Sequence, residues 1–371
     1  MHYIGNGING GNIGDDKSMI YTTYENQPVE YSLYGQFITY DELKKAILKE
    51  YSNDNYSKTI NVFIDIYQFL MTSLRFRKYT DPYSIAAAII NYAAHMRRYF
   101  RTVHNMYSNI VLIYSTNDSE NNTKFIPDYN VYYNNRKKIN HIMYDRIINN
   151  INLVKLLIPY IPDVFLKEGT VESSVIIHDI IQNRYMGLHP NLILSNSQLM
   201  YQLPQYSKSS IVIRKDLGFK PILNKTYTYN KNNCVEAYCY ELSKYNVTEP
   251  INQQTISFIM SLRGIPKRSI KALSSIKSVL KMAKQIPLGC EHDPNVQYNI
   301  YANNKSKRPV ISEDEFINRY KCIDLGYQYK LYKLLPESKE LKYLDQLNDK
   351  ESVQEINNYY FKNSPLNLEE L

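Results

Sequence analysis

The acidic side chains that could bind a metal are few and lie beside apolar runs. Asp65 ends the run "INVFID" within "INVFIDI" (60–66), and Glu172 opens the segment "ESSVII". A site for a pair of Mg²⁺ ions needs a cluster of carboxylates, because Mg²⁺ prefers hard oxygen ligands. Two carboxylates from different elements cannot hold such a pair. The sequence therefore predicts no metal, no cofactor and no catalytic residue, with Asp118 as the one further acid that could join them.

Both acids also have a structural interpretation. A single acid at the carboxyl end of a parallel strand can cap the following helix or accept hydrogen bonds from it, which fits Asp65. Acids are common in the first turn of a helix, which fits Glu172. Metal binding and these structural roles remain alternatives at this stage.

The cysteines and histidines favour no catalytic or metal site. Four cysteines in 371 residues, without CxxC spacing, predict reduced thiols. A zinc site from Cys234, Cys239 and His292 has poor spacing and a poor ligand set. Ser174, His178 and Asp179 fall on one predicted helix, where neighbouring side chains point about 100° apart, so they cannot form a triad.

A literal GxGxxG motif lies near the beginning of the sequence, at Gly5, Gly7 and Gly10. A dinucleotide site needs a core strand before this motif and a helix after it, and neither is predicted here. The motif is therefore attributed to a leader rich in Gly, Asn and Tyr.

Positive charge is concentrated in one segment. The formal net charge is +8, and residues 261–290 contain seven cations and no acid, whereas the last 60 residues hold 12 acids against 8 Lys and Arg. The cations are Arg263, Lys267, Arg268, Lys271, Lys277, Lys281 and Lys284. They predict either a surface that neutralises DNA phosphates without reading sequence or a solvated helix face, which could also meet an acidic partner. A second basic segment holds Arg136, Lys137 and Lys138, and it could equally be a polar loop.

The elements that position these residues alternate between helix and strand. Apolar runs predict buried strands at 60–66, 109–115, 191–195 and 209–215, separated by helical crossovers such as residues 84–107. This order predicts an α/β fold with a mostly parallel sheet flanked by helices. Residues 224–242 are predicted to form a hairpin. A helix-turn-helix element is predicted at about 255–285, its second helix following Pro266 directly.

Several segments resemble, in the correct order, the flap-endonuclease family of 5′ nucleases, which includes phage exonucleases and belongs to the wider PIN-like fold. "VFIDIYQFL" and "VLIYST" are similar to the first two strands, with Asp65 as a metal-binding acid. "FIPDYNVYYNNRKK" is similar to "PeYKanR", with Pro127, Tyr129 and Arg136 in correspondence. "VESSVII" falls where the family has "EADDVIA" and keeps Glu172. "SNSQLMYQL" aligns with "SxDxDLxQL", and "SLRGIPKRSIKAL" resembles the helix-turn-helix that grips duplex phosphates.

The same alignment shows which acids are missing. The resemblance implies seven acids in these segments, and the sequence keeps two. The five other positions hold Ser115, Ser174, Val175, Ser197 and Leu199. The resemblance, which covers about residues 59–290, therefore implies a PIN-like 5′-nuclease fold without the reaction.

Three regions follow: an N-terminal extension (1–58) that serves as an assembly arm, the nuclease-like domain (59–290), and a C-terminal helical extension (291–371). The resemblance, with these acids missing, implies a non-enzymatic structural subunit of a phage particle, a ring, collar or connector of the tail or portal region. Its expected partners are other virion proteins and copies of itself, with the DNA backbone as a further candidate partner. No run of about 20 apolar residues and no signal peptide is apparent, so the expected location is the virion, assembled in host cytoplasm, without membrane contact. The alternatives are a DNA-binding protein without sequence specificity and a residual metal-dependent nuclease.

Overall fold

The computed structural model describes thirteen stretches of the chain. They are residues 59–66, 84–103, 105–115, 141–158, 161, 163–182, 189–195, 197–207, 210–215, 226–243, 246–265, 270–304 and 310–334. The predicted assembly arm (1–58) lies outside the described residues.

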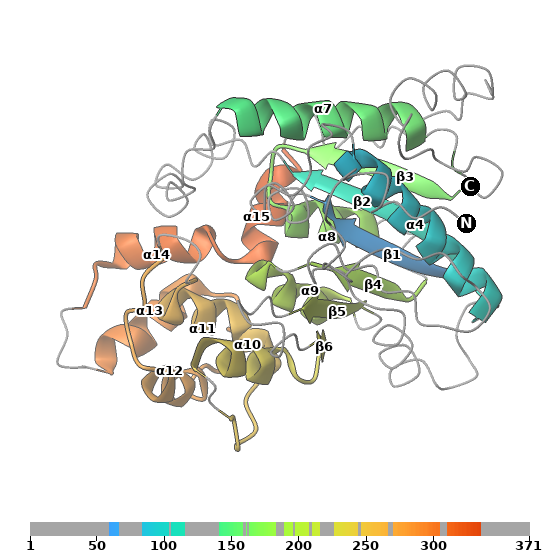
Figure 1. Ribbon diagram of the computed structural model, residues 1–371. Coiled ribbons are helices and arrows are strands. Elements are labelled where there is room, and N and C mark those ends of the chain that lie inside the picture. Colours follow the sequence, from blue (N-terminus) through green and yellow to red (C-terminus); the bar gives the residue numbers. More distant parts are fainter. Residues whose placement is uncertain are drawn as a thin grey trace.

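One six-stranded sheet forms the centre of the fold, in the order β3-β2-β1-β4-β5-β6 (Figure 1). The strands are β1 (Thr59–Asp65), β2 (Tyr107–Ser115), β3 (Val164–Gly169), β4 (Asn191–Leu194), β5 (Ser210–Lys215) and β6 (Thr226–Tyr229). The first five are parallel, and β6 pairs antiparallel with β5. The predicted α/β fold with a mostly parallel sheet flanked by helices is confirmed, as are the four predicted strands.

The strand β3 was not predicted from the sequence. Its residues "VFLKEG" bury only Val164 and Gly169, because it is the edge strand beside β2. By contrast, β1 is buried from Ile60 to Asp65 between two neighbours. A half-exposed edge strand needs fewer apolar residues than a central one, so the search for apolar runs did not predict β3.

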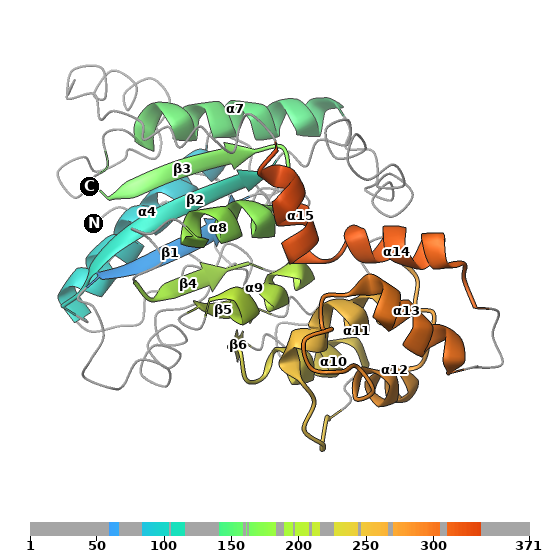
Figure 2. The same ribbon diagram turned by 180° about the vertical axis from the view of Figure 1, so that it is seen from behind.

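The helices cover both faces of the sheet. Helix α4 (Ser84–Val103) lies on one face together with α7 (His141–Leu157), which packs against α4, and α8 (Ser173–Gln182) lies on the opposite face (Figures 1 and 2). The chain moves from β1 outward to β3 and then returns to place β4 on the other side of β1. The carboxyl ends of β1 and β4 therefore meet at the point where ligands bind in open α/β sheets.

A row of asparagines fixes the alignment of the central strands. Asn109, Asn61 and Asn191 are neighbours in the register of β2, β1 and β4. The Asn109 amide donates to Asn61 at 3.0 Å, and the Asn61 amide donates to Asn191 at 2.9 Å. Because a shifted register would break these two hydrogen bonds, the row fixes the alignment of the three strands at their amino ends.

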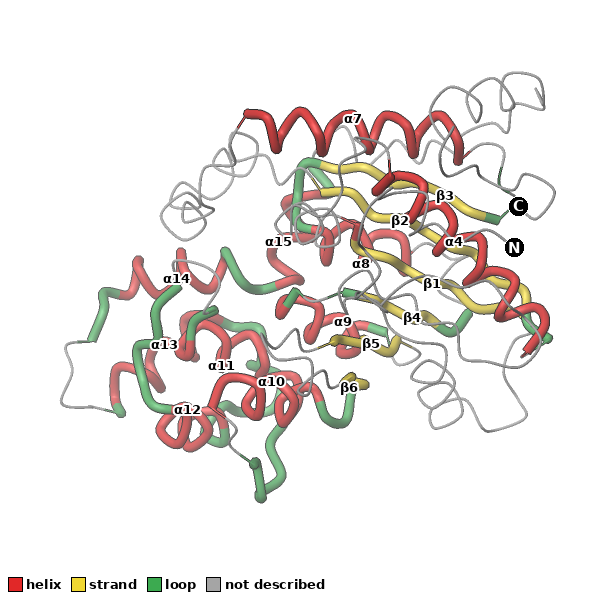
Figure 3. Tube along the Cα trace, in the orientation of Figure 1, coloured by secondary structure: helices red, strands yellow, loops and turns green. Residues whose placement is uncertain are grey.

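A group of helices lies to one side of the sheet (Figure 3). It comprises α10 (Cys234–Ser243), α11 (Ile256–Arg263), α12 (Ile276–Ala283), α13 (Pro294–Asn303) and α14 (Glu313–Lys321). The last described helix, α15 (Leu325–Tyr332), leaves this group and packs on α8. The boundary predicted at residue 290 falls inside the group, since α13 packs on α14 and α14 packs on α11. Within the described part of the chain, no helix has the length and hydropathy that a membrane span requires.

Two local predictions were wrong. Residues 224–242 do not form a hairpin: β6 ends at Tyr229, and α10 follows with Cys234, Val235, Tyr238 and Cys239 buried at helical spacing. The second helix of the helix-turn-helix does not begin after Pro266. It begins at Ile276, because the Ser275 side chain accepts a hydrogen bond from the amide of Ser278 and caps it there.

Candidate functional site

Asp65 is the centre of a buried polar cluster at the carboxyl edge of the sheet. It is 5% exposed at the end of β1. Its Oδ2 accepts hydrogen bonds from the Ser173 hydroxyl at 3.0 Å and from the Ser195 hydroxyl at 2.9 Å. Ser173 begins α8 and Ser195 follows β4, so the fold brings three separate segments together. We call Asp65, Ser115, Glu172, Ser173 and Ser195 the carboxyl-edge site.

Hydroxyl donors suit a carboxylate in a structural role. Both Ser hydroxyls direct a proton at Oδ2, one of the two oxygens through which a carboxylate could bind a metal ion. The sequence left two interpretations of Asp65 open, and these contacts display the one in which its carboxylate accepts hydrogen bonds. The donors come from α8 and from the segment after β4 rather than from the helix predicted to follow β1.

The residues that replace acids in the resemblance to 5′ nucleases serve packing and hydrogen bonding. The Ser115 hydroxyl donates to the carbonyl of Val171. The Ser197 amide donates to the Ser195 hydroxyl at 3.1 Å. Leu199 and Val175 are each 1% exposed and belong to the hydrophobic core. A carboxylate at Val175 or Leu199 would stand where apolar contacts now hold the sheet to its helices.

Glu172 lies immediately before α8 and is 5% exposed. Its carbonyl accepts the amides of Val175 and Ile176, at 2.9 and 3.3 Å, which starts the helix. Among the residues that the structure describes, no group of three or more His, Cys, Asp or Glu side chains could hold a metal ion. Asp118 lies outside the described residues.

The other candidate ligands of the sequence lie apart in different surroundings. Cys234 and Cys239 are buried free thiols, and burial raises the pKa of each to about 12. His292 instead pairs with Asp324, so the described residues do not bring these two cysteines and the histidine together as a zinc site. His178 and Asp179 share α8, where His178 packs on the Tyr206 ring and Asp179 pairs with Lys333 at 2.5 Å.

The second candidate region is the helix-turn-helix module, which we define as residues 256–283. Helix α11 ends at Gly264, which has a φ of 73°, and its amide donates to the carbonyl of Met260. Two hydrogen bonds close the turn. The Ile265 amide donates to the Ile270 carbonyl, and the Leu273 amide donates to the Leu262 carbonyl. A Cβ at Gly264 would lie 2.0 Å from the Ile270 oxygen, so this position requires glycine.

The cations predicted for DNA or partner binding divide into three groups. Lys271, Lys277 and Lys281 are exposed, and the last two lie four residues apart on one face of α12. Arg263 is partly buried, and its guanidinium donates to the carbonyl of Ser274 at 2.8 Å, so it also braces the module. The others lie outside the described residues: Lys267, Arg268, Arg136, Lys137 and Lys138.

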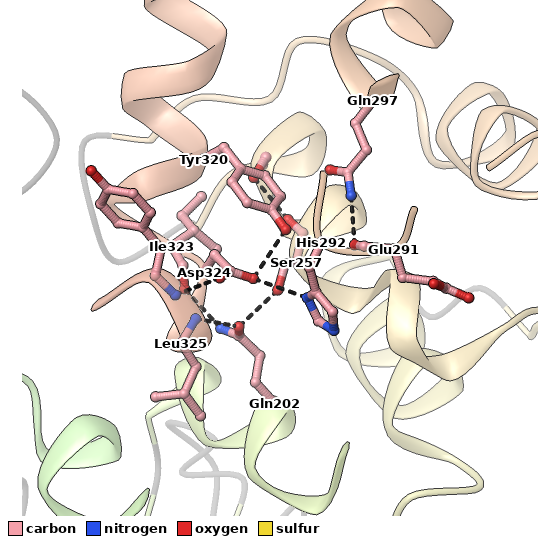
Figure 4. Close-up of polar contacts among 11 residues, drawn as sticks. Gln202, Ser257, Glu291, His292, Gln297, Tyr320, Ile323, Asp324 and Leu325 are labelled. Carbon is pink, nitrogen blue, oxygen red and sulfur yellow. Dashed lines mark hydrogen bonds and ion pairs between the residues drawn. The ribbon is translucent and has the colours of Figure 1, made fainter. Parts of the chain in front are cut away.

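A polar junction connects the two regions, and Figure 4 shows its side chains. The Gln202 side chain, 1% exposed, accepts from the Ser257 hydroxyl at 2.8 Å and the Leu325 amide at 2.9 Å, and it donates to the carbonyl of Ile323. Gln202 comes from the short helix after β4, and Ser257 comes from α11. Ile323 lies in the link between α14 and α15, and Leu325 is the first residue of α15. Gln202 thus joins the sheet to the helical group.

Asp324 is the charged member of this junction. It is 3% exposed, accepts from the Tyr320 hydroxyl at 3.0 Å, and lies 3.5 Å from the imidazole of His292. Burial favours the neutral acid, but hydrogen bonds from His292 and from the Tyr327 amide outweigh it and hold the pKa of Asp324 below its usual value. The same contact with Asp324 raises the pKa of His292.

The sequence did not indicate several of these structural partners. Ser173 lies one residue beyond Glu172 and carries no motif of its own. Tyr238 donates to the carbonyl of Gly264 at 2.6 Å, and Arg319 donates to the carbonyls of Ser261 and Lys271. The sequence separation between Arg319 and these carbonyls is 58 and 48 residues, so no local pattern could have revealed the contacts.

Comparison with known proteins finds structural likeness only. No known family model matches the sequence, and no curated protein matches it. The chain is similar to the T5 D15 protein co-crystallised with metal ions, at TM-score 0.47 and 11% identity over 76% of this chain and 97% of that one. It is similar to the bacteriophage T5 D15 flap endonuclease in complex with DNA and metal ions, at 0.48 and 10% over 82% and 99%. For the catalytic core of Rad2 in complex with DNA substrate the values are 0.41 and 11% over 85% and 90%.

Proposed function

We propose that this protein binds the backbone of duplex DNA without cleaving it. One contrast carries the proposal: the carboxylate of Asp65 is buried against two serine hydroxyls, while Lys271, Lys277 and Lys281 stand exposed on a braced helix-turn-helix module. Exposed lysines attract phosphates regardless of base sequence, because their charge acts on the backbone. The resemblance of this segment to the phosphate-gripping element of 5′ nucleases supports the same assignment.

Binding is tested by fluorescence anisotropy with labelled duplex, flap and single-stranded DNA over a series of salt concentrations. If the three lysines each neutralise one phosphate, they contribute about −2.7 to the slope of log K against log salt on duplex DNA. The double variant Lys277→Ala/Lys281→Ala should reduce the steepness of that slope by about 1.8. Lys330→Ala, an exposed lysine on α15, is the matched control. Absence of binding by the wild type at low salt would overturn the proposal.

The absence of cleavage is tested separately with Mg²⁺ and with Mn²⁺ on the same substrates. We expect no product from the wild type, because two buried acids and the hydroxyls around Asp65 leave no carboxylate cluster for two metal ions. If the wild type cleaves and Asp65→Ala does not, the residual nuclease of the sequence analysis is the correct assignment.

A subunit of a phage particle, in a ring, collar or connector, is the second proposal. The same closed carboxyl-edge site favours it, since a structural subunit needs the scaffold and not the reaction. The predicted assembly arm and the basic loop that would meet neighbours lie outside the described residues. Mass spectrometry of purified particles tests this role, and absence of the protein from them would rule it out.

A further inference from the structure

The end of α11 is held by donors from other elements. The last carbonyls of a helix have no partner within it and must be satisfied from outside. Here the Ser261 carbonyl accepts from the Arg319 guanidinium, and the Leu262 carbonyl accepts the amides of Leu273 and Ser274, at 2.7 and 3.4 Å. The Gly264 carbonyl accepts the hydroxyl of Tyr238. The turn that follows α11 is therefore fixed by partners on α10 and α14 as well as by its own amides.

Arg319 contacts both sides of this turn. Its Nε donates to the Ser261 carbonyl in the last turn of α11, and its Nη2 donates to the carbonyl of Lys271, beyond the turn. The side chain is 4% exposed, so little water competes for these donors. A guanidinium can bridge two carbonyls in fixed directions, whereas an ammonium acts as a single point charge. Arg319 therefore sets the position of the Lys271 backbone relative to α11.

We infer that Arg319 is a positioning residue for DNA binding: through the carbonyl of Lys271, it holds the Lys271 side chain where it meets a phosphate. This inference rests on the proposed DNA binding. It assigns a role to the C-terminal helical extension, since α14 supplies the arginine that keeps the basic face of the helix-turn-helix module assembled. Arg319 itself does not contact the DNA, yet the affinity of the protein for DNA depends on Arg319.

The first experiment needs no DNA. Amide hydrogen exchange is measured on the full chain as wild type, as Arg319→Met and as Arg319→Lys, following the amides of Ile265 and Leu273. We expect exchange at least tenfold faster in Arg319→Met, an intermediate rate in Arg319→Lys, and no change in the control Lys333→Met, which removes the ion pair with Asp179 elsewhere on the extension. Unchanged exchange at Ile265 and Leu273 in both Arg319 variants would overturn the inference.

The second experiment measures the salt dependence of duplex binding. Arg319→Met should lower the affinity about tenfold at moderate salt and reduce the steepness of the slope by about 0.9, the value for one lost phosphate contact. Lys271→Ala should have the same effect on the slope, and the double variant should reduce it no further. An Arg319→Met slope equal to that of the wild type would refute the positioning role, and if Arg319→Met fails to fold, Arg319→Lys serves in its place. If the wild type does not bind while exchange responds as expected, the proposed DNA binding fails and Arg319 keeps only its structural contact.

Discussion

Asp65 at the end of β1 is 5% exposed and receives two serine hydroxyls, whereas Lys277 and Lys281 on α12 stand in solvent. Both regions are rigidly held, one by the parallel sheet and one by bridging hydrogen bonds. They differ in whether their charge can reach a partner. In the carboxyl-edge site the serine hydroxyls donate to Oδ2 of the Asp65 carboxylate and to a backbone carbonyl, so these polar groups are engaged inside the protein. The helix-turn-helix module has its backbone satisfied by its own amides and by donors from α10 and α14, and it leaves its lysines to the solvent.

This difference teaches that hydrogen bonds can fix two polar regions of one fold while only one of them leaves its charged side chains exposed to a partner. Gln202 connects the two regions, since it lies in the segment after β4 and bonds Ser257 of α11, Ile323 and Leu325. A buried amide with three partners is costly to replace, because each partner would be left unsatisfied.

The largest expected effect is that of Gly264→Ala, which disturbs the backbone of the helix-turn-helix module. The backbone φ of 73° and the 2.0 Å approach of a Cβ to the Ile270 oxygen should together lower the free energy of unfolding by roughly 3–5 kcal/mol. Gly289→Ala is the matched control, because its φ of 88° costs only about 1–2 kcal/mol where nothing lies within 4 Å. Urea unfolding of both variants measures the difference. Equal losses would show that the close approach at Gly264 is unimportant.

The second prediction concerns the pH dependence of the folding stability through His178, on the helix α8 that packs on the sheet. Burial of His178 between Tyr206 and Tyr329 lowers its pKa from 6.5 to about 4. Because the folded pKa lies below the unfolded one, the neutral imidazole stabilises the fold above pH 6.5, and this contribution is lost as the pH falls toward 4. The loss amounts to roughly 3 kcal/mol. His178→Gln should unfold with a flatter pH dependence over this window, and parallel curves for variant and wild type would contradict the assignment.

The third prediction separates a structural from a metal-binding Asp65. Asp65→Ala removes the acceptor of the Ser173 and Ser195 hydroxyls and should cost about 2 kcal/mol, whereas Asp65→Asn keeps an acceptor oxygen and should cost less. Thermal melts with and without millimolar Mg²⁺ measure both. The wild type should melt at the same temperature in each buffer, and a Mg²⁺-dependent rise that both variants abolish would reopen the metal site.

The smallest effect is expected at the junction. Contact with Asp324 raises the pKa of His292, so its contribution is fully present below the unfolded pKa of 6.5 and is lost as the pH rises through the folded value. The side chain of His292 is 46% exposed, and solvent screening limits the effect to less than about 1 kcal/mol. Urea unfolding between pH 6 and 8 should show this loss in the wild type and not in His292→Asn. A loss of the same size in both would assign it to another group.

The sequence by itself determined the mostly parallel sheet and the absence of acids at five positions where the resemblance to 5′ nucleases implies them. Runs such as "VFID" and "NLIL" contain enough apolar residues to be recognised as strands from the sequence. That Ser115, Ser197 and Leu199 are uncharged can likewise be read from the sequence directly. The helix-turn-helix at 255–285 was also predicted, because Gly264 and Pro266 interrupt an otherwise helical pattern. Such features can be predicted from the sequence, since each depends on residues only a few positions apart.

Only the tertiary structure decided how the remaining polar groups are used. That Ser173 and Ser195 both reach Asp65, that Gln202 ties the sheet to the helical group, and that Arg319 spans the turn after α11 all depend on contacts between segments 48 to 130 residues apart. The beginning of α12 at Ile276 was likewise decided by the bonds that hold residues 270–274 to α11, against a helical pattern in the sequence. Hydrogen bonds are short and directional, so their partners follow from the folded arrangement and not from the order of residues.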